Sequence, residues 1–122
     1  MKKLISLCIV FLGITVQAQD VQWLKAYELS VNYEGWSDWE PVNIDIKIDF
    51  NKDLIVIFSK EIQIYEILSD LPSLKDDTGK NVRFRIIDQD KDIGVLTFRV
   101  QNNGTKQIYL QFNDVGWVYN VK

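Results

Sequence analysis

The residues that could carry chemistry in this chain of 122 amino acids are carboxylates and tryptophans, because histidine is absent and the single cysteine is Cys8. Without histidine or a later cysteine, histidine-activated serine chemistry, thiol chemistry and ordinary zinc sites are excluded. Carboxylate pairs of the glycosidase type are left, and the candidates are Asp38 with Glu40 and Asp88 with Asp90. All four acids fall in expected turns, where carboxylates are usually just solvated, so the sequence predicts a non-catalytic protein.

Three acids alternate in one short stretch with the opening rhythm of a calcium-binding loop: Asp88, Asp90 and Asp92. The rest of the stretch departs from that pattern. Gly94 comes one place later than an EF-hand turn requires, Lys91 lies inside the loop, and Arg99 stands where the closing bidentate Glu belongs. A turn rich in aspartate explains the stretch without metal, so no cofactor is expected, and a weak calcium site is the alternative.

The best candidate for a recognition surface is a loop in which two tryptophans flank an acid, Trp36, Asp38 and Trp39. Sugar rings stack on indole faces while their hydroxyls bond to carboxylates, and the same side chains suit a protein hot spot. The alternative is that these rings, with Trp23 and Trp117, plug the end of a barrel as part of its core.

The element that organises the chain is a β-hairpin over residues 42–58. Three isoleucines alternate with charged residues in its first half, which gives an extended strand one apolar and one polar face. Asn51 and Lys52 then reverse the chain into five apolar residues, 54–58. This turn predicts that Ile48 lies opposite Ile55 and Ile46 opposite Ile57.

The second strand of this hairpin is apolar on both faces. In the predicted register Val56 opposes Lys47 and Phe58 opposes Asp45 on the outer side. Something must therefore cover Val56 and Phe58: a loop of the same chain, a partner, or the aliphatic stem of Lys47. Val56 and Phe58 are accordingly candidate partner-binding residues.

Further alternating segments predict strands at residues 23–33, 62–68, 82–86, 95–101, 106–112 and 117–121. Residues 59–61 form either a bulge or a turn, because no Gly, Asn or Pro marks them. The polar stretch 69–81 is expected to be a loop, because Pro72 and Gly79 end regular structure there. About eight strands joined by short turns predict an all-β, antiparallel meander that closes into a small barrel or barrel-like sandwich, filled by its large side chains.

Residues 1–18 have the pattern of a signal peptide. Lys2 and Lys3 precede an apolar run of roughly 13 residues, where a membrane anchor needs about 20, and Ala18 fits a cleavage site. Residues 19–122 then form a single domain without a membrane span, in the periplasm or outside the cell. Cleavage of the signal peptide removes Lys2 and Lys3 and changes the formal charge from −3 to −5. A negative net charge argues against nucleic acid or anionic lipid as a partner.

Several loose motifs run through the whole chain: a leader ending in VQAQ, a W-x-x-W loop, an Asp-rich turn before the sixth strand, and a closing I-Y-L-x-F-N-D…Y. With these features the chain resembles the small exported β-rich proteins of unknown function common in the Bacteroidetes. The resemblance implies an envelope or secreted location and no particular active site. The sequence favours a binding or interaction domain, such as an accessory subunit of an envelope complex, over a small-ligand or glycan-binding barrel.

Overall fold

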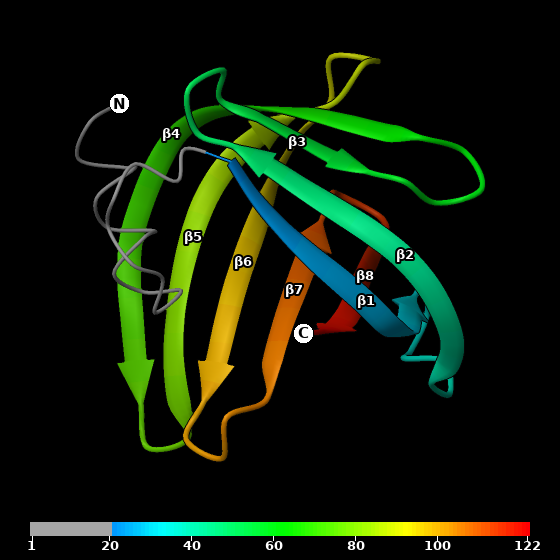
Figure 1. The fold of residues 1–122 in the computed structure, drawn as a ribbon, viewed down its shortest axis with the longest axis vertical. Coiled ribbons are helices and arrows are strands. Elements are labelled where there is room, and N and C mark those ends of the chain that lie inside the picture. The colour runs from blue at the N-terminus through cyan, green and yellow to red at the C-terminus, as the bar shows by residue number, and fades with distance from the viewer. Residues whose placement is uncertain (1–20) are drawn as a thin grey trace.

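The computed structural model describes residues 21–122, and the signal peptide expected at residues 1–18 lies outside the described residues. Residues 21–122 form eight strands and no helix. The strands are shown in Figure 1 and are β1 (Val21–Asn32), β2 (Glu40–Asp49), β3 (Leu54–Ile57), β4 (Gln63–Asp76), β5 (Gly79–Ile87), β6 (Ile93–Gln101), β7 (Lys106–Gln111) and β8 (Gly116–Val121).

Each strand pairs antiparallel with the next, and β8 pairs with β1 to close a barrel. The all-β meander is thus confirmed, and of the two predicted closures the chain adopts the barrel. Successive turns alternate between the two ends of an up-and-down barrel. We call one end the mouth; the loops that belong to it are residues 33–39, 58–62, 88–92 and 112–115.

The organising hairpin has the predicted register. Ile48 pairs with Ile55, Ile46 with Ile57 and Lys47 with Val56. The turn is tightened by Asp49, whose Oδ1 accepts the backbone N–H groups of Asn51 and Lys52 at 3.1 Å each. Alternation of apolar and charged residues was therefore sufficient to fix which side chains face the core.

The ambiguous residues 59–61 belong to a turn and not to a bulge. Ile57 at the end of β3 pairs antiparallel with Gln63 at the start of β4, so the chain reverses between them. The Ser59 hydroxyl donates to the Glu61 carbonyl at 2.6 Å and accepts from the Gln63 amide at 2.9 Å. Side-chain hydrogen bonds of this kind replace the Gly or Asn that a tighter turn would need.

The prediction of a loop at residues 69–81 is wrong. β4 continues to Asp76, and β5 already begins at Gly79, ahead of the predicted strand start. Register shifts between Ile67 and Ser69 and between Leu71 and Leu74 mark two bulges. The second bulge contains Pro72, so the residue that cannot donate to a ladder lies where the ladder is interrupted, and the strand continues past it.

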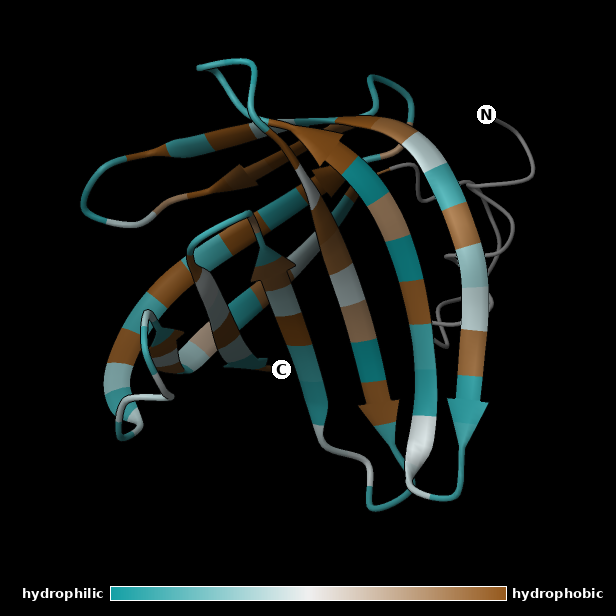
Figure 2. Ribbon diagram, turned by 180° about the vertical axis from the view of Figure 1, so that it is seen from behind, coloured by the Kyte–Doolittle hydropathy of each residue, from teal (hydrophilic) through white to brown (hydrophobic). Residues whose placement is uncertain are grey.

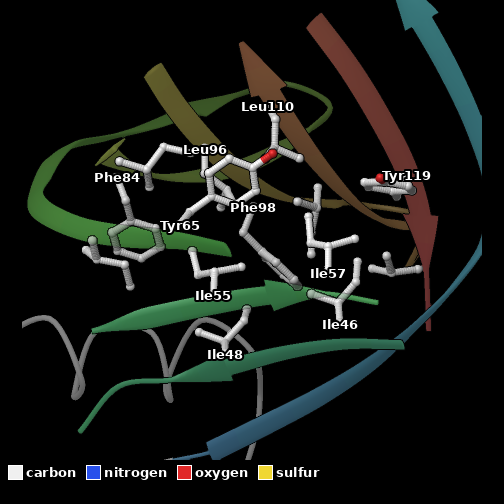
Figure 3. Close-up of a cluster of buried hydrophobic side chains, with 14 of the residues drawn as sticks. Ile46, Ile48, Ile55, Ile57, Tyr65, Phe84, Leu96, Phe98, Leu110 and Tyr119 are labelled. Atoms are coloured by element: carbon white, nitrogen blue, oxygen red, sulfur yellow. The ribbon is translucent and has the colours of Figure 1, made fainter. Parts of the chain in front are cut away.

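The core fills the inside of the barrel. Figure 3 shows isoleucines of β2 and β3 pointing toward aromatic and leucine side chains of the facing strands. Fully buried members include Ile46, Ile55, Ile57, Ile86 and Leu96, each 0% exposed. Apolar and polar residues alternate along the long strands in Figure 2, as one buried and one exposed face require. An eight-stranded barrel filled in this way leaves its outer surface and its mouth for binding.

Candidate functional site

Three aromatic rings stack in a row at the mouth of the barrel. The ring centroids of Tyr65 and Phe112 are 5.9 Å apart, and those of Phe112 and Trp117 are 5.8 Å apart. Two hollows, of about 330 and 520 Å³, meet at Trp117, which packs against the core. Among the tryptophans, Trp117 therefore fits the predicted plug, whereas Trp23 and Trp36 lie on the outer surface, where they are 57% and 50% exposed.

A hydrogen-bonded cluster lies beside this aromatic row. The Gln63 amide donates to the Tyr119 hydroxyl at 3.1 Å and accepts from the Tyr65 hydroxyl at 2.6 Å. Burial raises the pKa of Tyr65 above its usual value, and the nearby Tyr119 and Asp88 add to this rise. Burial also raises the pKa of Tyr119, against the hydrogen bond from Gln63. Both phenols are therefore neutral at physiological pH. Their hydrogen bonds with Gln63 hold the start of β4 against β8 at the mouth.

The Asp-rich turn at the mouth is braced by its first acid. Asp88 Oδ1 accepts the backbone N–H groups of Asp90 and Asp92, both at 2.9 Å, and Lys91 adopts a left-handed φ of 72°. This is the geometry of an aspartate-closed turn. Within residues 21–122, no group of three or more His, Cys, Asp or Glu side chains is close enough together to hold a metal ion.

The outer face of the first four strands carries an apolar patch. The register aligns Trp23, Lys47, Val56 and Ile64 across β1 to β4, so these side chains share one outer row. Phe58 and Ile62 follow in the adjoining turn and are 41% and 56% exposed. We call Trp23, Val56, Phe58, Ile62 and Ile64 the apolar outer patch.

Part of this patch is covered by the chain itself. The Trp23 ring stacks on Phe58 with centroids 5.9 Å apart and an interplanar angle of 19°. The Lys47 ammonium lies 5.8 Å from the centroid of the Trp23 ring, which is a cation–π contact. The sequence allowed the Lys47 stem as one cover for Val56 and Phe58. The contact observed for Lys47 is instead between its ammonium and the Trp23 ring, and the ring that covers Phe58 is that of Trp23, which the sequence did not indicate. Both aromatic residues remain partly exposed to solvent, Trp23 to 57% and Phe58 to 41%.

The loop that carries the predicted recognition residues is held firmly against the outside of the barrel. Trp36 forms a bridge with Asn32, and Ser37 N–H donates to the Val31 carbonyl at 2.8 Å. The Ser37 hydroxyl accepts the Val31 N–H at 2.9 Å, and the Ser30 hydroxyl donates to the Ser37 carbonyl at 2.7 Å. The loop is therefore a fixed strap and not a lid over the mouth.

This strap places Trp36 next to a groove on the outer face of β4 to β7. The Trp36 ring meets Tyr109 edge to face, with centroids 6.3 Å apart. The groove has a volume of about 440 Å³, and its lining includes Trp36, Leu74, Arg83, Thr97, Arg99 and Tyr109. We call it the Trp36 groove.

The other two members of the predicted recognition loop do not join this groove. Asp38 is exposed and Trp39 is 43% exposed, and neither is part of its lining. Asp38 and Glu40, one of the two carboxylate pairs considered for catalysis, are both exposed at the surface.

Sequence reasoning missed the arginines and the tyrosine of the Trp36 groove. Arg83, Thr97 and Tyr109 are directly paired across β5, β6 and β7, so they form one outer row. The alternation in β5 and β6 does place the arginines on the polar face, so their outward direction could have been predicted from the sequence. What the sequence did not contain was the contact between residue 36 and residue 109, which depends on closure of the barrel.

Comparison of the chain with protein-family models, curated proteins and solved structures finds no match. Residues 21–122 contain no helix that is long and apolar enough to cross a membrane.

Proposed function

We propose that this protein is a non-catalytic, exported interaction domain that binds a protein partner through its apolar outer patch. The observation that carries the proposal is the pair of stacked rings, Trp23 and Phe58, which face solvent on the outside of a barrel whose interior is already filled. Exposed apolar groups that are contiguous mark interaction sites more often than scattered ones do.

The chemistry around the patch favours a protein as its occupant. Aromatic anchors surrounded by charged groups are typical of protein interfaces. Here the rings adjoin Lys47 and an ion pair in which Lys25 Nζ lies 2.6 Å from Asp45 Oδ1. An anionic membrane surface is disfavoured, because the chain carries a formal charge of −3. The partner is expected to present an apolar pocket or ridge with polar groups at its edge.

Two further properties belong to the proposal and rest on sequence. Export rests on the signal-peptide pattern of residues 1–18 and on the resemblance to small exported Bacteroidetes proteins, which also suggests an accessory role in an envelope complex. A non-catalytic role is supported by the absence of histidine from the whole chain and by the exposed surface positions of three of the four candidate acids, Asp38, Glu40 and Asp90.

The test is affinity capture from the native envelope followed by reconstitution from purified components. A partner that binds the patch should bind at least about tenfold more weakly to Trp23→Ala and to Phe58→Ala in calorimetry, because such rings act as hot spots. Trp39→Ala and Tyr33→Ala are matched controls, since both remove exposed rings outside the patch. Equal losses in the controls contradict the proposal.

Sedimentation of the purified protein provides the second arm of the test. A monomer at micromolar concentration agrees with a different protein as the partner. A dimer that dissociates on Phe58→Ala identifies a second copy of this chain as the occupant and overturns the proposal of a separate partner.

A further inference from the structure

We propose that the Trp36 groove is a second binding site and that its ligand is an acidic glycan, a saccharide chain bearing carboxylate or sulfate groups. The site is separate from the proposed partner surface, because none of the residues that line the groove belongs to the apolar outer patch. The inference rests on three features of the groove: its charge, its aromatic wall and the rigidity of its floor.

The charge of this face is positive although the chain as a whole is negative. All three arginines of the sequence, Arg83, Arg85 and Arg99, lie on the outer side of β5 and β6, because they alternate with core residues. Arg99 is partly neutralised by Asp76, at 3.5 Å. Guanidinium groups bind carboxylate and sulfate oxygens with paired hydrogen bonds, so this face suits an anionic ligand.

The arginines of the groove are held in place and still have donors to offer. Arg83 donates from Nε and Nη2 to the Pro72 carbonyl at 3.2 and 3.1 Å, which uses two of the five N–H groups of a guanidinium. Arg99 donates from Nη1 to Asn81 at 3.1 Å and also reaches Thr78. Side chains fixed in this way lose little conformational entropy when a ligand binds.

The aromatic wall supplies the part of the site that recognises a sugar ring. Trp36 is 50% exposed, and its edge-to-face contact is with Tyr109, which lies in the floor of the groove. An exposed indole face accepts the C–H face of a pyranose, while neutral polar groups bind hydroxyls; Asn81, Thr97 and Gln111 provide such groups in the lining. A flexible acidic peptide offers no comparable flat face.

The floor beneath this wall is preorganised by a ladder of side-chain hydrogen bonds. The Tyr109 hydroxyl donates to Gln107 Oε1 at 3.1 Å, and Gln107 Nε2 donates to Asn120 Oδ1 at 2.9 Å. Asn120 Nδ2 donates in turn to Glu28 Oε1 at 2.9 Å, so the ladder reaches from β7 through β8 to β1. Because Tyr109 is held by Gln107 on the same face of β7 and the strap is held at Ser37, the Trp36 groove is formed before any ligand arrives.

The experiment titrates the purified protein with oligogalacturonate, with its methyl ester and with heparin oligosaccharides, followed by tryptophan fluorescence and calorimetry. The free acid should bind at least tenfold more tightly than the neutral ester, and its affinity should fall as salt is raised. Trp36→Ala should remove the change in emission and weaken binding about tenfold. Arg83→Gln and Arg99→Gln, which change the two arginines that line the groove, should each weaken it severalfold.

Two controls separate the groove from other surfaces. Trp39→Ala removes the neighbouring exposed ring and Lys60→Gln removes a positive charge in the mouth loop, and both should bind like the wild type. Wild-type affinity in Trp36→Ala, equal binding of acid and ester, tighter binding of poly-L-glutamate than of any saccharide, or no binding of either acidic saccharide at millimolar concentration overturns the inference. Since Trp23 and Phe58 take no part, these results leave the partner surface to its own test.

Discussion

At the scale of single residues, Asp76 shows how one exposed carboxylate can organise a turn. Its Oδ1 accepts the Thr78 hydroxyl and the Thr78 N–H at 2.8 Å each, and the Gly79 N–H at 2.9 Å. These hydrogen bonds, led by that of the Thr78 side chain and joined by Arg99, lower the pKa of Asp76 from 3.8 to about 2. Because the folded protein prefers the ionised form, Asp76 stabilises the fold above pH 3.8, and this stabilisation is lost as the pH falls through about 2.

Replacement of this carboxylate should therefore have an effect that depends on pH. Asp76→Asn should lower the melting temperature by a few degrees at pH 7, because the charge-assisted hydrogen bonds are lost. The gap between variant and wild type should shrink toward pH 2, where the wild-type carboxyl is protonated as well. Asp77→Asn is the control, because Asp77 is an exposed carboxylate in the same turn and the three hydrogen bonds described above go to Asp76. Thermal unfolding from pH 2 to 7 makes the measurement, and a gap that stays constant contradicts it.

Single residues also show what the sequence could predict about the candidate sites. Val56 and Phe58 were predicted correctly as outward-facing, because the two-residue period of a strand assigns its faces without any knowledge of the fold. The surroundings of Trp36 could not be predicted. Its partner Tyr109 lies 73 positions later in the chain, and only barrel closure brings the two rings together.

At the scale of elements, β4 is where local pattern and structure disagree. Leu71 and Leu74 pair with Arg83 and Asn81, so both leucines lie on the outer face although they are three residues apart. A strict period of two would place them on opposite faces, and the bulge at Pro72 removes this conflict. The sequence of this segment resembles a loop because it is polar, contains Pro72 and breaks the alternation of a strand. Its pairing with β5 nevertheless keeps it extended.

The Arg83 side chain should stabilise this second half of β4 as a local brace. Arg83→Ala removes both hydrogen bonds to the Pro72 carbonyl, so the amides of residues 74–81 should exchange with deuterium severalfold faster. The melting temperature should change little, because the core is not touched. Arg85→Ala is the matched control, an exposed arginine two residues along the same strand. Equal exchange in the two variants would show that the brace contributes nothing.

At the scale of the whole molecule, the fold depends on the seam between the first and last strands. β1 pairs with β2 and β8 on its two sides, and Ala26, 0% exposed, is paired with both neighbours. Beyond the ladder, Lys25 and Lys122 exchange backbone hydrogen bonds of 3.1 and 2.9 Å. The sequence left barrel and sandwich open because closure depends on accumulated twist and bulges, which no single segment encodes.

Since the barrel is closed by pairing and not by chain order, its ends should be movable. Ala26 pairs with Val121, and Val21 lies five residues before Ala26 along β1. A linker from the end of β8 to Val21 must therefore span about 17 Å. A permutant joined from Lys122 to Val21 by about eight Gly and Ser residues, opened in the exposed turn between Asn103 and Gly104, should fold with the same circular dichroism.

A variant that lacks residues 116–122 is the counterpart of this permutant, because it loses β8 and with it the β1–β8 pairing. Without β8, the outer edges of β1 and β7 are exposed and Tyr119 leaves the core, so cooperative unfolding in urea should be lost. The permutant keeps every strand pair, and its melting temperature should lie within about 10 °C of the wild type, since a short linker changes chiefly the loop-closure entropy. A folded deletion variant, or an unfolded permutant, would mean that the β1–β8 seam is not what holds the barrel closed.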